Sequence, residues 1–250
     1  MALRLVTFDA LHTIITPRLP IHVQYSQTFS PYLGHLNPDS IKWSFKVALK
    51  DVQEENPLFS VGAQAWWREV IRRTALGAGA EEQALNYSLH EIVPALMRRF
   101  SSKEGYKAFD DAIPTMSHLL SLGIRTAIVS NGDSRIRAVL QDLNFPKEVQ
   151  PMLFSDEEGV EKPSREIFIR ALERVNAMGS ERPAILPVHC LHVGDELEAD
   201  YFGAMNAGFR PLLLRRDGLD GEHAHKELHE TLQDVDVVKD LHAVVKYIIS

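Results

Sequence analysis

The stretch Leu3-Arg4-Leu5-Val6-Thr7-Phe8-Asp9 decides the fold of this chain. It is a short apolar run that ends at a charged residue, which predicts a buried β-strand with Asp9 at its carboxyl end. Similar apolar runs recur at four later places: 124–129, 152–154 (shorter and weaker), 191–193 and 211–214. Segments with helical spacing of apolar residues separate them, at 111–122, 134–143, 163–177 and 199–207. This alternation predicts an α/β protein with a parallel sheet covered by helices on both faces.

Residues 16–107 have a different pattern, with few strand-like runs. Asn37-Pro38 is typical of a helix start. Helical spacing continues at 64–75 and 81–100. The last of these stretches carries an apolar stripe that predicts helix–helix packing: Leu85, Leu89, Ile92, Leu96 and Phe100. We therefore predict a helical module, residues 16–107, inserted into a core that is formed by residues 1–15 and 108–250.

Composition limits the classes of function. The chain has 250 residues, a formal net charge of −7 and 45% hydrophobic residues, which is ordinary for a globular protein. The acidic balance argues against general nucleic-acid binding, which needs a basic surface. A local pocket can still bind a small anionic substrate. No apolar run approaches the roughly 18 residues of a membrane span. We expect a cytoplasmic protein without a membrane partner.

Three further residue groups have plain structural interpretations. Cys190 is the only cysteine and lies in an apolar stretch, which favours a buried structural thiol. His223, His225 and His229 lie in the polar segment 217–234, where the lack of matching carboxylates favours a solvated loop over a metal site. Trp43, Trp66 and Trp67 could form a subunit interface, but helical spacing favours the core of the helical module. The sequence does not reveal the oligomeric state.

Polar residues follow the predicted strands where a ligand site of an open α/β sheet is expected. Asp9 follows the first strand, Ser130-Asn131 the second, and Gly194-Asp195 begins an acidic run that ends at Asp200. Lys162 stands at the start of a helix between the last two. Taken singly, each feature is weak, because a strand-end Asp is more often a helix cap and a lone Lys is usually on the surface. Their joint occurrence in this order predicts a functional site.

These residue types suit metal-assisted chemistry on an anion. The Asp9 carboxylate can attack an electrophile and form a covalent intermediate, and Lys162 can favour its ionised form. Attack on a phosphate requires charge neutralisation, which a divalent ion supplies, and Mg²⁺ prefers oxygen ligands. The predicted ligands are Asp9, Asp195 and the backbone carbonyl of Leu11, with Asp200 as an outer ligand or water holder. Ser130, Asn131 and nearby backbone N–H groups are predicted to hold the phosphoryl oxygens.

The ordered set of Asp9, Ser130-Asn131-Gly132, Lys162-Pro163 and Gly194-Asp195 through Asp200 resembles the four motifs of the haloacid dehalogenase superfamily. The resemblance covers nearly the whole chain, and it implies a Rossmann-like core, magnesium and an aspartyl-enzyme intermediate at Asp9. The helical module then resembles the cap that many members carry. Thr13 matches the family's first-motif Thr, which adds it to the substrate-binding residues.

A narrower resemblance rests on Trp66-Trp67 and the long first-motif loop. These features are similar to the subgroup of haloacid dehalogenase-like hydrolase domain-containing protein three.

One position departs from the family pattern. Family phosphatases carry a second Asp two residues after the nucleophile as general acid, and here that residue is Leu11, followed by His12 where Gly is usual. Leucine has no proton to donate, and loss of a general acid costs about 10²–10⁴-fold in rate. Three interpretations follow: a slow or specialised phosphatase, a protein that binds without turnover, or a haloacid dehalogenase. For His12, a packing or surface role is favoured over acid catalysis.

Overall fold

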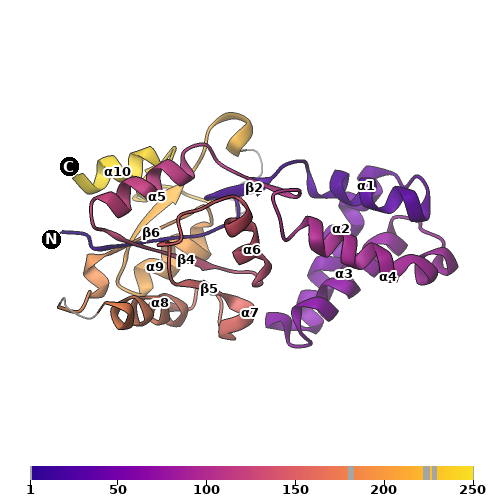
Figure 1. Cartoon of the computed structure of the whole chain (residues 1–250), viewed down its shortest axis with the longest axis horizontal. Coiled ribbons are helices and arrows are strands. Elements are labelled where there is room, and N and C mark those ends of the chain that lie inside the picture. Colours follow the sequence, from indigo (N-terminus) through magenta and orange to yellow (C-terminus); the bar gives the residue numbers. More distant parts are fainter. Residues whose placement is uncertain (1, 180–182, 222–225, 227–229, 250) are drawn as a thin grey trace. The chain divides into compact units, whose positions relative to one another are not determined.

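Six parallel strands form one sheet in the order β5-β4-β1-β6-β7-β8 (Figure 1). The strands are β1 (Leu5–Phe8), β4 (Arg125–Ser130), β5 (Met152–Phe154), β6 (Cys190–Gly194), β7 (Arg210–Leu214) and β8 (Val237–Val238). Phe8 lies in register with Ile128 on one neighbour and with Val193 on the other. Asp9 therefore follows a central strand of the sheet. The predicted α/β class with a Rossmann-like parallel sheet is confirmed.

The structure is a computed structural model that describes residues 2–179, 183–221, 226 and 230–249. His223, His225 and His229 lie outside the described residues. The chain divides into two compact units: a core unit, Met1–Thr16 with Ala108–Ser250, and a helical unit, Pro17–Lys107. Two short strands, β2 (Ile15–Pro17) and β3 (Tyr106–Ala108), pair with each other where the chain passes between the units.

Helices cover both faces of the sheet in the core unit. Figure 1 shows α5 (Ala112–Ser121) and α10 (His242–Ile249) together on one face, and α8 (Arg165–Met178) with α9 (Gly203–Asn206) on the other. Two shorter helices, α6 (Arg135–Asp142) and α7 (Ser155–Glu158), follow β4 and β5. This two-sided cover explains why the strands read as continuous apolar runs, since a parallel sheet is buried on both faces.

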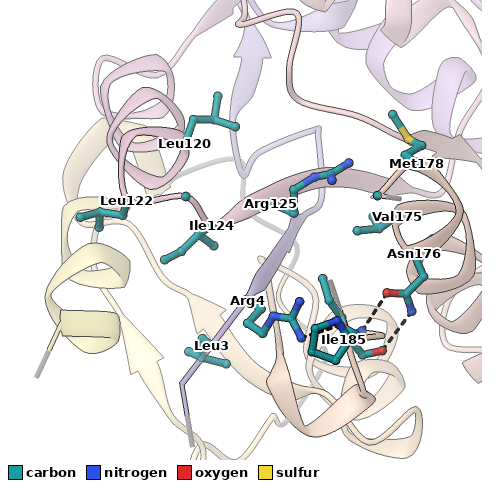
Figure 2. A pocket seen from close by; sticks show the side chains of 13 residues that line it. Leu3, Arg4, Leu120, Leu122, Ile124, Arg125, Val175, Asn176, Met178 and Ile185 are labelled. Atoms are coloured by element: carbon teal, nitrogen blue, oxygen red, sulfur yellow. Dashed lines mark hydrogen bonds between the residues drawn. The ribbon is translucent and has the colours of Figure 1, made fainter. Parts of the chain in front are cut away.

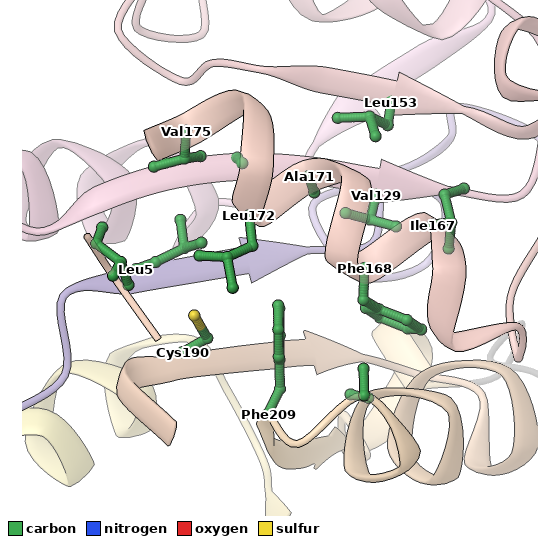
Figure 3. Packing of buried hydrophobic residues seen from close by; sticks show 14 residues of the cluster. Leu5, Val129, Leu153, Ile167, Phe168, Ala171, Leu172, Val175, Cys190 and Phe209 are labelled. Atoms are coloured by element: carbon green, nitrogen blue, oxygen red, sulfur yellow. The ribbon is translucent and has the colours of Figure 1, made fainter. Parts of the chain in front are cut away.

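A hydrophobic cluster joins the sheet to α8 (Figure 3). Leu5 on β1, Val129 on β4 and Leu153 on β5 are fully buried and face the helix. Ile167 and Phe168 of α8 are equally buried against them. Burial of such side chains stabilises a fold by about 1.5–3 kcal/mol each. Cys190 lies in the same cluster, where burial raises the pKa of its thiol to about 12, as expected of a structural thiol.

The helical unit contains four helices: α1 (Ile21–Leu33), α2 (Pro38–Glu55), α3 (Ala63–Gly77) and α4 (Glu82–Arg99), with a short 3₁₀ turn, η1 (Pro57–Phe59), after α2. The Asn37 side chain accepts hydrogen bonds from the N–H groups of Asp39 and Ser40 and caps α2 as predicted. All five residues of the predicted stripe on α4 are buried, which confirms the predicted helix–helix core. Trp66 is also buried, but Trp43 is 72% exposed, so its predicted core position is wrong.

None of the helices formed by the described residues is both long and apolar enough to cross a membrane.

Candidate active site

Asp9 lies immediately after β1 at the carboxyl edge of the sheet. Its N–H donates to the carbonyl of Val193 on β6 over 2.9 Å, which continues the ladder by one residue. Only 7% of the residue is exposed, and its Oδ1 lies 2.6 Å from Nζ of Lys162. The sheet thus fixes the Asp9 backbone, and the Lys162 ammonium fixes the Asp9 carboxylate.

Lys162 lies in the loop between α7 and α8, and Asn131 holds that loop in place. The Asn131 amide donates to the Lys162 carbonyl and accepts from the Lys162 N–H, each over 2.8 Å. The side chain of Asn131 is therefore occupied by the lysine backbone and positions the ammonium. The other two predicted substrate-binding residues, Ser130 and Thr13, are both buried, and the Thr13 hydroxyl donates to Asp195. Ser130 is buried at the end of β4, and its hydroxyl acts to lower the pKa of Asp9.

The Lys162 ammonium lies between two carboxylates. Its Nζ is 2.6 Å from Oδ1 of Asp9 and 2.6 Å from Oδ1 of Asp200. Burial by itself lowers the pKa of Lys162, but the attraction of Asp200 and Asp9 outweighs it, so the pKa lies above its usual value. The lysine stays protonated and acts as a fixed positive charge.

Asp195 and Asp200 come from β6 and the turns after it. Asp195 accepts a hydrogen bond from the Thr13 hydroxyl over 3.3 Å. Asp200 lies in η3, a π-type helical turn (Leu197–Phe202), and its Oδ2 accepts from the Glu196 N–H over 2.9 Å. A Cβ atom on Gly194 would lie 2.1 Å from Cγ of Asp200. Glycine is thus required at position 194 because the Asp200 carboxylate packs directly against the strand.

Three buried carboxylates meet at this edge. Oxygen atoms of Asp9, Asp195 and Asp200 all lie within 4.8 Å of one another. Burial raises the pKa of Asp9, an effect that Lys162 opposes and Asp200 reinforces, and the net shift is upward. For Asp200, burial also raises the pKa, but Lys162 and His192 outweigh it and the net shift is downward. Three carboxylates around one ammonium leave an excess of negative charge that suits a divalent cation.

The loop after Asp9 is closed by its own backbone. The N–H groups of Ile14 and Ile15 both donate to the Ala10 carbonyl, over 2.9 and 3.0 Å, and the His12 N–H donates to the Ile15 carbonyl over 2.7 Å. His12 has a φ of 61°, in the left-handed region that favours glycine. Glycine adopts this backbone conformation more readily than histidine does. Leu11 and His12 are both half-buried, and the Leu11 carbonyl remains a predicted metal ligand.

Sequence reasoning missed several buried polar residues that support the site. His192 lies within the apolar run at 191–193, and Thr7 lies within the first strand. Arg215 and Arg216 follow β7 and donate to the backbone carbonyls of Asp195 and Thr13, respectively. A polar residue inside a buried strand is the one signal that could have marked His192.

A cavity of about 610 Å³ lies elsewhere in the core unit (Figure 2). It is at the amino ends of β1 and β4, the opposite edge of the sheet from Asp9. Among the described residues that line it, the only charged side chains are Arg4 and Arg125, and Arg4 donates to the Pro183 carbonyl over 2.9 Å. Without a nucleophile or carboxylate, this cavity does not belong to the site.

Comparisons with known proteins point to one family. The sequence model of the haloacid dehalogenase-like hydrolases matches residues 3–208. The chain is 27% identical over 239 residues to haloacid dehalogenase-like hydrolase domain-containing protein 3 of Danio rerio, an alignment that covers 93% of each chain. Proteins of the same name from other vertebrates also match, which supports the subgroup resemblance.

Solved structures show the same fold. A magnesium-bound HAD-hydrolase of Bacillus subtilis, YfnB, is 18% identical, covers 100% of both chains and superposes with a TM-score of 0.68. A dehalogenase with an intermediate complex is 17% identical, with a TM-score of 0.68, and the match covers 100% of this chain and 98% of the other. At these identities the likeness establishes the fold and leaves the reaction open.

Proposed function

The chain belongs to the haloacid dehalogenase-like hydrolase family, and on that premise we propose that it is a magnesium-dependent hydrolase of small phosphate esters. The observation that carries the proposal is the buried cluster in which Asp9 lies 2.6 Å from Lys162 and within reach of Asp195 and Asp200. A nucleophilic oxygen, a fixed cation and a cation-binding acidic group meet at one edge of the sheet. We also expect a cytoplasmic protein that binds neither nucleic acid nor membrane.

The metal is proposed from the chemistry of the donor set. Asp9, Asp195 and the carbonyl of Leu11 would hold it, with Asp200 further out, and these hard oxygen donors suit Mg²⁺. The ion would neutralise charge on the transferring phosphoryl group.

The residues of the chain supply the remaining steps. Lys162 opposes the upward shift that burial and Asp200 impose on the pKa of Asp9 and so favours its ionised form, whose oxygen would attack phosphorus while the bond to the leaving oxygen breaks. We propose that Ser130 and Thr13 orient the phosphoryl oxygens. Water then cleaves the aspartyl-phosphate, releases phosphate and regenerates the Asp9 carboxylate.

Leu11 narrows the range of substrates. Leu11 cannot protonate a leaving oxygen. We therefore propose that the leaving group departs as a stable anion, or that another residue, such as His12, donates the proton. An aryl phosphate satisfies this requirement and is the appropriate first probe.

The test is hydrolysis of para-nitrophenyl phosphate with and without Mg²⁺. We expect Mg²⁺-dependent release of phosphate that falls by at least about 10³-fold in Asp9→Asn, because the nucleophile is lost. Glu158→Gln is the control, since it removes a buried carboxylate that pairs with Arg170 and Arg174, outside the cluster. Activity that survives Asp9→Asn would contradict the proposal.

The presence of leucine at position 11 also supports two other functions, and each predicts a different experimental result. Failure to hydrolyse a broad phosphate ester panel, with Mg²⁺ still bound, would indicate a binding protein. Halide release from a 2-haloacid without added metal would indicate a dehalogenase, the activity named for one structural neighbour.

A further inference from the structure

Beneath the acidic cluster lies a buried polar pair, Thr7 and His192. Both side chains are fully buried on neighbouring strands, β1 and β6. The Nδ1 atom of His192 is 2.8 Å from the Thr7 hydroxyl, and its Nε2 atom is 3.1 Å from Oδ1 of Asp200. The ring also packs edge-on against Phe168, with 4.9 Å between ring centroids. A buried imidazole is costly unless hydrogen-bonded, so these two contacts define its state.

The protonation of the ring follows from its partners. The Asp200 oxygen that faces Nε2 also accepts from the Lys162 ammonium, and a carboxylate oxygen paired in this way is an acceptor, so the contact calls for a proton on Nε2. Nδ1 faces the Thr7 hydroxyl, which can donate to it, so one proton on Nε2 satisfies both nitrogens of the ring. Nδ1 is then an acceptor, and the Thr7 hydroxyl donates to it. The other acceptor near that hydroxyl, the Leu191 carbonyl, is more distant at 3.3 Å.

Asp200 is thereby held by three donors. Its Oδ1 accepts from Lys162 and His192, and its Oδ2 accepts from the N–H of Glu196. Because both oxygens are engaged, the carboxylate cannot rotate freely, and its position sets that of the Lys162 ammonium. The same ammonium contacts the proposed nucleophile, Asp9, so the chain of contacts runs from β1 through β6 and back to the end of β1.

We propose that Thr7 and His192 are positioning residues: Thr7 holds the His192 ring by donating to Nδ1, and His192, with its proton on Nε2, fixes Asp200 so that Lys162 stands correctly beside Asp9. The catalytic part of this inference rests on the proposed function. The His192 tautomer and the restraint of Asp200 do not depend on the proposed function.

The first experiment is ¹⁵N NMR of the metal-free protein with labelled histidine, at neutral pH. The His192 signals are identified by their loss in His192→Gln. We expect a protonated Nε2 and an unprotonated Nδ1, because the bare nitrogen resonates well downfield of the protonated one. A proton on Nδ1, or on both nitrogens, would overturn the proposal.

The second experiment compares variants of the pair. His192→Leu removes both hydrogen bonds, whereas His192→Gln retains an amide N–H that can reach Asp200. We expect His192→Leu to lower kcat on para-nitrophenyl phosphate by about 10–100-fold with little change in KM, as outer-shell substitutions do. His192→Gln should recover most of that loss. Equal losses in the two variants would indicate mere packing and would overturn the proposal.

Thr7→Val has a matched control in the neighbouring strand. Thr126 on β4 is also fully buried, and its hydroxyl has no hydrogen-bond partner among the described residues. Thr7→Val should lower kcat and shift the ¹⁵N resonance of His192 Nδ1, because it removes the donor to that nitrogen, whereas Thr126→Val should leave both unchanged. Equal effects of the two substitutions would contradict a specific role for Thr7.

The two proposals fail separately. If the wild-type protein hydrolyses no phosphate ester, the proposed function is wrong, and the ¹⁵N signals of His192 in the wild type and in Thr7→Val still decide the positioning pair. If turnover is found but the Nε2–H tautomer is not, only the positioning pair is wrong.

Discussion

At the scale of single residues, Leu11 is the position that most limits the proposed reaction. It is half-buried in the loop closed by the Ala10 carbonyl, two residues after the proposed nucleophile. The cluster contains the proposed nucleophile, Asp9, and the Lys162 ammonium. A poor leaving group also needs a residue that protonates its oxygen, and Leu11 cannot do so. An alkyl phosphate should therefore be a much poorer substrate than an aryl phosphate.

Restoring an acid at this position tests that argument. We expect Leu11→Asp to raise kcat on an alkyl phosphate by about 10²-fold or more, the usual contribution of general acid catalysis. The ratio of alkyl to aryl phosphate turnover is the measurement. Leu11→Asn has a similar shape but donates no acidic proton, so it should show no such gain. Equal activation by both variants would show that the gain does not come from an acidic proton.

At the scale of elements, the carboxyl end of β7 supports two loops of the site. Arg215 donates to the Asp195 carbonyl and forms an ion pair with Glu230, with Nη2 2.7 Å from the carboxylate. Arg216 makes two hydrogen bonds of 2.8 Å to Asp111 and one of 3.0 Å to the Thr13 carbonyl. Two consecutive arginines thus fix the backbones that carry Asp195 and Thr13.

Asp111 gives this support a pH dependence. Burial raises the pKa of Asp111, but Arg216 and the Leu241 N–H outweigh it, so the pKa lies below its usual value of about 3.9. Because the pKa is lower in the folded protein, ionised Asp111 stabilises the fold fully at pH values above its usual pKa. That contribution is lost as the pH falls through the pKa of the folded state. Asp111→Asn should therefore lower the free energy of unfolding by about 1.5–3 kcal/mol at pH 7, and by less at pH 3.

Urea unfolding at the two pH values measures this difference. Asp110 is the adjacent and exposed residue, so Asp110→Asn is the matched control and should change stability little at either pH. An Asp111→Asn loss that is the same at pH 3 and pH 7 would show that the Arg216 ion pair is not its cause.

The predictability of each element followed its length and periodicity. The strands with apolar runs, β1, β4, β6 and β7, were placed within two residues of their observed ends. The short strands β2, β3 and β8 have two or three residues each and carry no periodic signal. Helices α1 and α10 were not predicted. In α1 the interior Pro31 interrupts the pattern.

The residues of the site also fall into a part that the sequence predicts and a part that it does not. Asp9, Lys162, Asp195 and Asp200 were chosen because ligand sites follow the ends of parallel strands, and the structure brings them together. The pairing of Asn131 with the Lys162 backbone joins residues 31 apart, and that of Thr7 with His192 joins residues 185 apart. Such contacts depend on strand order and register, which local sequence patterns do not specify.

At the scale of the whole molecule, charge is concentrated where the cation is proposed. The chain has a formal net charge of −7, and three buried carboxylates lie together at the sheet edge, where Lys162 pairs with two of them. Repulsion among buried like charges destabilises the metal-free fold, and a bound divalent cation relieves it. The thermal stability of the protein should therefore depend on Mg²⁺.

We expect Mg²⁺ at about 100 times its dissociation constant to stabilise the folded protein by about 2.7 kcal/mol. For a domain of this size, that corresponds to a rise in Tm of roughly 5–10 °C in scanning calorimetry. Asp195→Asn removes one of the repelling charges along with a ligand, so it should melt above the wild type without Mg²⁺ and show no rise when Mg²⁺ is added. Glu158→Gln, with the cluster intact, should keep the full response. A Tm rise retained in Asp195→Asn would place the cation outside this cluster, because a cation site elsewhere would not depend on the Asp195 carboxylate.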